Sequence, residues 1–140
     1  MQASETVNRI VTDYLAECTR LLANVKPAAG LFGLGRDPAI DRCHELFFFE
    51  LEKKIADMAV EPVSGEEAYD AILTLFTAPE KQPCPDTACW SLMASHKTVL
   101  PLIPLLNVEQ RNALRLWYDT HIPRRERLPV QKAVYRALKA

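Results

Sequence analysis

Glycine is scarce in this sequence, with 4 among 140 residues, and three of the four are Gly30, Gly33 and Gly35. Long apolar runs are also missing. No stretch of about 18 apolar residues is present, which argues against a membrane-spanning helix. The first residues, MQASETVNRI, contain neither the basic start nor the apolar stretch of a signal peptide. These absences predict a cytoplasmic protein without a membrane partner.

A second absence concerns strand patterns. Apolar and polar residues do not alternate over any sustained stretch, and apolar residues instead recur at spacings of three and four, as in Val7, Ile10, Val11 and Tyr14. A chain of this length can bury a core as one domain. The sequence therefore predicts an all-α fold, a single compact bundle of five to six helices without a β-sheet, formed by residues 1–140.

Capping residues and prolines set the expected helix ends. Ser64 with Glu67, and Asn107 with Gln110, have the spacing of a capping box. Residues 77–85 are rich in proline and are expected to form a connector, and the prolines at 101 and 104 are expected to break or kink the fourth helix. The expected helices cover residues 4–26, 38–59, 64–76, 86–100, 107–122 and 129–138.

The glycine-rich stretch precedes the second helix, where a phosphate-binding loop is one interpretation. It lacks the lysine followed by Ser or Thr of a P-loop, and it lacks the Rossmann spacing and a preceding strand. Asp37, at the expected start of the helix, would repel a phosphate. We interpret the stretch as a structural bend. Binding of an anion by Arg36 is the less favoured alternative.

Catalytic motifs are missing as well. The four cysteines, Cys18, Cys43, Cys84 and Cys89, form no CxxC pair, and without a secretion signal we expect reduced thiols. No HExxH or ExxH pair is present. The absence of a complete catalytic set favours a protein that is not an enzyme.

The three histidines offer one alternative. His44, His96 and His121 fall on the apolar stripes of three different helices, so each is expected to face inward. Three imidazoles with an open fourth position describe a catalytic zinc site, and Asp41, one turn from His44, would orient or join the ligands. Zinc or another transition metal would then support hydrolase or transferase chemistry. Independent structural histidines are the favoured interpretation, and no cofactor is expected with them.

In size and class the chain is similar to bacterial helical-bundle proteins that bind a metal through three histidines. The HxxxH pair that is usual in those proteins is absent from this sequence. The similarity therefore rests on architecture alone.

Apolar residues that lie off the main stripe of the second helix support the leading hypothesis, although most aromatic residues at helical spacing belong to a core. In the second helix one stripe is formed by Ile40, Phe47, Leu51, Ile55 and Met58, whereas Leu46 and Phe49 lie on the opposite side. Asp41, Glu45 and Glu52 form an acidic flank, and Trp90 is a further aromatic anchor. We expect a small interaction or regulatory protein that binds a protein partner, or a second copy of itself, through this helix.

Charge is distributed unevenly along the chain. Residues 1–110 contain 9 Lys and Arg against 16 Asp and Glu, whereas residues 111–140 contain 8 against 2. Arg124, Arg125 and Arg127 are therefore candidates for an anion or nucleic-acid contact, which is the second alternative. A sequence pI of about 6.3 disfavours a general nucleic-acid binder, and the favoured interpretation is that the basic end docks on its own acidic body.

Overall fold

The computed structural model describes residues 3–23, 38–81, 84 and 86–139. These residues form six α-helices and contain no strand, which confirms the predicted all-α class. The expected bend at the glycine-rich stretch, with Arg36 and Asp37, lies outside them. In chain order the elements are α1 (Ala3–Ala23), α2 (Pro38–Val60), α3 (Gly65–Lys81), α4 (Asp86–Ala94), the 3-10 helix η2 (Ser95–Leu105), α5 (Val108–His121), the 3-10 turn η3 (Arg124–Glu126) and α6 (Pro129–Lys139).

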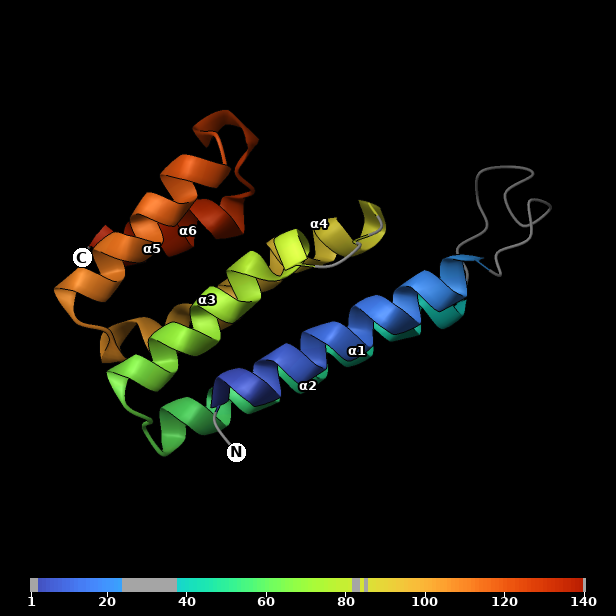
Figure 1. The fold of residues 1–140 in the computed structure, drawn as a ribbon, viewed down its shortest axis with the longest axis horizontal. Coiled ribbons are helices and arrows are strands. Elements are labelled where there is room, and N and C mark those ends of the chain that lie inside the picture. The colour runs from blue at the N-terminus through green and yellow to red at the C-terminus, as the bar shows by residue number, and fades with distance from the viewer. Residues whose placement is uncertain (1–2, 24–37, 82–83, 85, 140) are drawn as a thin grey trace.

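The helices are arranged around α3 and η2. Helix α1 packs against α2 and α3, and α5 and α6 lie side by side at the opposite end of the bundle (Figure 1). The segment η2 contacts α2, α3, α4 and α6 and so joins the two ends. The buried apolar side chains form one continuous cluster to which all six α-helices contribute. None of the described helices is long and apolar enough to cross a membrane.

Two expected boundaries are wrong. Helix α3 continues through Pro79 to Lys81 instead of ending at residue 76. A proline this close to the end of a helix removes one hydrogen bond, and the buried Ala78 beside it keeps the last turn packed. The fourth helix ends at Ala94 rather than at residue 100, and the chain continues through Pro101 and Pro104 as the 3-10 helix η2. A proline inside an α-helix lacks the N–H for the hydrogen bond to residue i−4 and clashes with that carbonyl, so the α-helix does not extend over these residues.

Local capping agrees with the sequence. The Asn107 side chain accepts a hydrogen bond from the Gln110 backbone N–H at 2.8 Å, and the Gln110 side chain accepts one from the Asn107 backbone N–H at 3.0 Å. This is the complete predicted capping box of α5. The Ser64 hydroxyl likewise accepts from the Glu67 backbone N–H at 3.1 Å. Directly after Ser64, a Cβ at Gly65 would stand 2.7 Å from the Leu105 carbonyl oxygen, so glycine permits the close contact of α3 with η2.

Candidate functional site: the surface of the second helix

An open groove runs beside α2 and has a volume of about 840 Å³. Two large aromatic side chains lie exposed along it, Phe49 at 65% and Trp90 at 61%. Aromatic side chains left this exposed on one surface are typical of sites that bind another molecule. We call this surface the acidic groove. It is lined by Leu22, Ile40, Asp41, His44, Glu45, Phe48, Phe49, Glu52, Trp90 and Ser91.

The carboxylates of the acidic groove come from one face of α2. Asp41, Glu45 and Glu52 are four and seven residues apart, so successive helical turns bring them to the same side. The described lining contains these three carboxylates and no Lys or Arg. The sequence predicted both the acidic flank and the aromatic residues, and the structure places them on one surface. Trp90 reaches this surface from α4.

The floor of the acidic groove is a polar cluster that the sequence did not predict. The Tyr14 hydroxyl of α1 lies 2.6 Å from Nδ1 of His44, and the Ser91 hydroxyl of α4 lies 3.3 Å from the same nitrogen. Burial lowers the pKa of His44, with Asp41 opposing the effect, and burial also raises the pKa of the Tyr14 hydroxyl. A neutral imidazole that accepts from Tyr14 therefore ties three helices together beneath the groove.

Leu46 belongs to a different surface. Its side chain is 55% exposed and lines a second groove between α1 and α2, of about 510 Å³. This groove carries charges of both signs, from Arg9, Arg20 and Arg42 and from Asp13, Glu17 and Glu50. The sequence correctly predicted that Leu46 and Phe49 lie opposite the buried stripe of α2. It did not predict that they line separate grooves.

His96 is the histidine that faces fully inward, as predicted. It is 3% exposed and packs on the Phe76 ring at a centroid distance of 4.3 Å. Its Nδ1 lies 2.7 Å from the Tyr118 hydroxyl and 3.4 Å from Nε2 of the buried Gln131. Burial lowers the pKa of His96 to about 3, so the ring is neutral and accepts a hydrogen bond from the tyrosine.

The inward orientation expected for His121 is wrong, because this side chain is 40% exposed. The buried positions of α5 are Leu114 and Tyr118. His121 is the last residue of the helix, where the chain turns away from the core and the periodic pattern no longer applies. Its Nδ1 lies 2.9 Å from the Trp117 carbonyl oxygen, and its Nε2 lies 3.1 Å from a carboxylate oxygen of Glu80.

The three histidines do not meet. His44 and Asp41 line the acidic groove, whereas His96 and His121 line a separate cleft on the other side of α4. Among the described residues, no group of three or more His, Cys, Asp or Glu side chains is placed to hold a metal ion. The three-histidine metal site thus stays a prediction that this geometry does not support.

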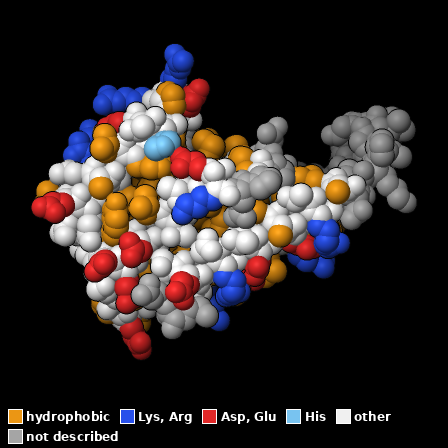
Figure 2. Space-filling model, in the orientation of Figure 1, with side chains coloured by type: hydrophobic (Ala, Val, Ile, Leu, Met, Phe, Trp, Pro, Cys, Tyr) orange, Lys and Arg blue, Asp and Glu red, His pale blue; other side chains and the backbone are white. Residues whose placement is uncertain are grey.

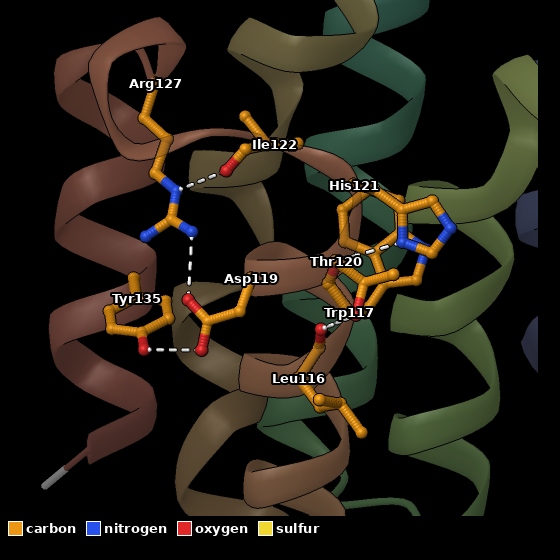
Figure 3. A network of polar contacts seen from close by, with 8 residues as sticks. All are labelled: Leu116, Trp117, Asp119, Thr120, His121, Ile122, Arg127 and Tyr135. Carbon is orange, nitrogen blue, oxygen red and sulfur yellow. Dashed lines mark hydrogen bonds and ion pairs between the residues drawn. The ribbon is translucent and has the colours of Figure 1, made fainter.

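The arginines of the basic turn divide into two kinds. Arg124 and Arg125 are exposed, but Arg127 is 7% exposed and forms hydrogen bonds within the protein (Figure 3). Its guanidinium donates to the Ile122 carbonyl at 3.0 Å and to Asp119 at 3.1 Å. This hydrogen bond lowers the pKa of the Asp119 carboxyl. Two donors of Arg127 thus stabilise the turn, whereas the exposed Arg124 and Arg125 remain the candidates for an anion contact.

The Asp119 carboxylate also fixes α6. It accepts a hydrogen bond from the Tyr135 hydroxyl at 3.0 Å, and the Arg127 guanidinium lies 4.6 Å from the centre of the Tyr135 ring (Figure 3). Val134 and Leu138 of α6 are buried in the core. The apolar face of this basic helix is thus covered by the rest of the chain.

No protein-family model, curated protein or solved structure matches this chain. The class of protein is therefore described from its own structure. It is an all-α bundle that presents an aromatic groove bordered by carboxylates.

Proposed function

We propose that the protein is an interaction module that binds a basic, amphipathic helix of a partner protein in the acidic groove. One observation carries this proposal: Phe49 and Trp90 lie exposed on the same surface as three carboxylates. The aromatic rings supply apolar contact area, and the carboxylates complement Lys or Arg on the partner.

The length of the groove supports a helix as the occupant. Beyond Glu52 a further hollow of about 300 Å³ continues along α2 as far as Ala56 and is bordered by Lys97 and Leu100 of η2. Glu52 lines both hollows. From Ile40 to Ala56 the helix rises about 24 Å, which matches a partner helix of about 16 residues. An amphipathic helix laid into a groove is a recurring mode of peptide recognition.

A second copy of this chain fits the groove less well. A two-fold dimer across the groove would bring the carboxylates of one copy against those of the other. The basic helix α6 of a second copy is also unsuitable, because its apolar side chains are already buried in its own core. These two arguments favour a separate partner over self-association.

The experiment is a titration with two designed peptides of about 16 residues. Both have leucines at helical spacing, and one carries Lys where the other carries Glu. We expect the Lys peptide to bind and the Glu peptide not to bind. Phe49→Ala and Trp90→Ala should each weaken the complex by about tenfold, as truncation of an interface anchor does. Leu116→Ala is the matched control, because Leu116 is 66% exposed but lies on α5.

Two results would contradict the proposal. One is a Kd for the Lys peptide that is the same in Phe49→Ala as in the unsubstituted protein. The other is a dimer in sedimentation experiments that Phe49→Glu dissociates, since this would assign the groove to a second copy.

A further inference from the structure

The groove between α1 and α2 that Leu46 lines is a second open surface of α2, and we call it the α1–α2 groove. Ile10, Leu21 and Phe47 contribute apolar side chains to its lining, and Leu46 is its most exposed large apolar residue. A single exposed leucine is common on protein surfaces and indicates no binding site by itself. The arrangement of the charged residues around Leu46 is what distinguishes this surface.

The charges that line the α1–α2 groove are balanced, with three basic and three acidic side chains. Four of the six belong to α1 and form ion pairs within that helix. Arg9 lies 3.6 Å from Asp13, and Arg20 pairs with Glu17. The acidic groove, in contrast, has three carboxylates and no Lys or Arg in its described lining. Charge repulsion therefore opposes a second copy at the acidic groove and does not oppose one at the α1–α2 groove.

The remaining two charges are placed symmetrically about Leu46 on α2. Arg42 lies four residues before Leu46 and Glu50 lies four residues after it, and all three line the same groove. Residues at this spacing form one ridge of a helix, and each charge lies about 6 Å from Leu46 along the helix axis. Neither Arg42 nor Glu50 forms an ion pair within the part of the chain that the structure describes. Both are thus available to a partner.

A two-fold axis through Leu46 would pair both charges at once. When a second copy packs antiparallel on α2, Leu46 meets Leu46 of the second copy, Arg42 lies opposite its Glu50, and Glu50 lies opposite its Arg42. A parallel arrangement would place each charge against its own kind, which repulsion disfavours. Ridges of residues four apart pack against each other when two helices cross at about 50°. The pattern of α2 is therefore complementary to itself in the antiparallel arrangement.

We propose that the protein forms an antiparallel homodimer through the α1–α2 groove, with Leu46 at the two-fold axis and two ion pairs between Arg42 and Glu50 of different copies. The α1–α2 groove and the acidic groove share no lining residue. The dimer contact therefore does not occupy the acidic groove, and each copy keeps its own site for a basic partner helix.

The test is sedimentation equilibrium of the full chain at protein concentrations from about 1 μM to about 1 mM. We expect a dimer. Arg42→Glu places like charges opposite each other at both symmetric positions, and Glu50→Arg does the same, so each should raise the dimer Kd at least about tenfold. The double variant Arg42→Glu/Glu50→Arg restores opposite charges and should recover the dimer. Arg136→Glu is the matched control, because Arg136 is exposed on α6 and the charge changes equally.

A mixture of the two single variants tests the two-fold arrangement directly. Arg42→Glu leaves an acidic residue at both positions and Glu50→Arg leaves a basic residue at both. The two variants should therefore bind each other more tightly than either binds itself. Leu46→Glu should abolish the dimer, whereas Phe49→Glu should leave it intact, and circular dichroism checks that each variant keeps its helical content.

Three results would each overturn the proposal. They are a monomer at every concentration, a folded double variant that does not recover the dimer, and a dimer that Phe49→Glu dissociates and Leu46→Glu does not. The binding of the Lys peptide is measured separately and depends on Phe49 and Trp90. A failure of the dimer and a failure of the acidic groove are therefore distinguishable.

Discussion

The imidazole of His96 is kept neutral by the residues around it, and this lowers the stability of the folded protein at acidic pH. In an unfolded chain a histidine has a pKa of about 6.5, whereas burial lowers the pKa of His96 to about 3. Between these values the unfolded state binds a proton that the folded state does not bind. The stability contribution of the neutral ring is therefore complete above about pH 6.5 and is lost as the pH falls towards 3.

The first prediction follows from this difference. The free energy of unfolding should fall by up to about 1.4 kcal/mol per pH unit below pH 6 because of His96, in addition to the effect of the carboxylates. His96→Gln, which keeps an acceptor but does not titrate, should flatten this dependence in urea unfolding measured from neutral pH to about pH 4. Lys97→Gln, at the exposed neighbouring position, should retain the slope of the unsubstituted protein. A parallel pH dependence in His96→Gln would contradict the assignment.

The sequence could not predict which side chains form hydrogen bonds with the buried histidines. Periodicity correctly placed His96 on a buried face. The hydroxyls that satisfy the histidines, Tyr118 for His96 and Tyr14 for His44, lie 22 and 30 residues away in the chain. Only packing of separate helices brings such groups together. The same reason explains why three histidines on apolar stripes did not converge.

At the scale of the element, periodicity was most informative for α2. Phe47, Leu51, Ile55 and Met58 of its predicted stripe are buried, and the exposed Leu46 and Phe49 lie opposite them. Ile40 and His44, at the start of the same stripe, are half-buried and line the acidic groove. The pattern is clear because α2 extends over 23 residues, so several turns repeat the same arrangement. Prolines misled the prediction at α3 and η2, because whether a proline ends a helix depends on its position in the turn and on the packing beside it.

The capping box of α5 supports a prediction at this scale. Asn107→Ala removes the acceptor for the Gln110 backbone N–H and should lower the free energy of unfolding by about 1 kcal/mol. Asn112→Ala is the matched control, since Asn112 is exposed within the same helix. There the better helix propensity of alanine should leave stability unchanged or slightly higher. Thermal or urea unfolding of both variants measures the difference. Equal destabilisation would show that the cap does not hold the helix start.

For the molecule as a whole, charge is separated in space as well as in sequence. On the face shown in Figure 2, Lys and Arg gather over the end where α5 passes into η3, and Asp and Glu are frequent near the turn between α2 and α3. Composition predicted this asymmetry. The favoured interpretation, that the basic end docks on its own body, agrees with the packing of α6 against η2 and α5. Composition did not show that Arg127 and the apolar face of α6 make this attachment. The exposed charges that remain attract partners over a range set by salt.

Overall charge and local charge therefore need to be separated when partner choice is tested. Reversing Glu45 and Glu52 to Lys changes the net charge from −1 to +3, and reversing the exposed Glu61 and Glu66 to Lys changes it equally. Only the first pair lines the acidic groove. We expect the Glu45→Lys/Glu52→Lys protein to prefer the Glu peptide over the Lys peptide, a reversal of at least about tenfold in each Kd, because repulsion at contact distance sets specificity.

The Glu61→Lys/Glu66→Lys protein should keep its preference for the Lys peptide and lose only part of its affinity, most clearly at low salt, because its altered charges act from a distance. Isothermal titration of both peptides at two salt concentrations measures this. If the two double variants changed preference to the same extent, net charge would govern binding, and the groove would not be the recognition site. A reversal confined to the groove variant requires that the partner's basic residues contact Glu45 and Glu52 directly.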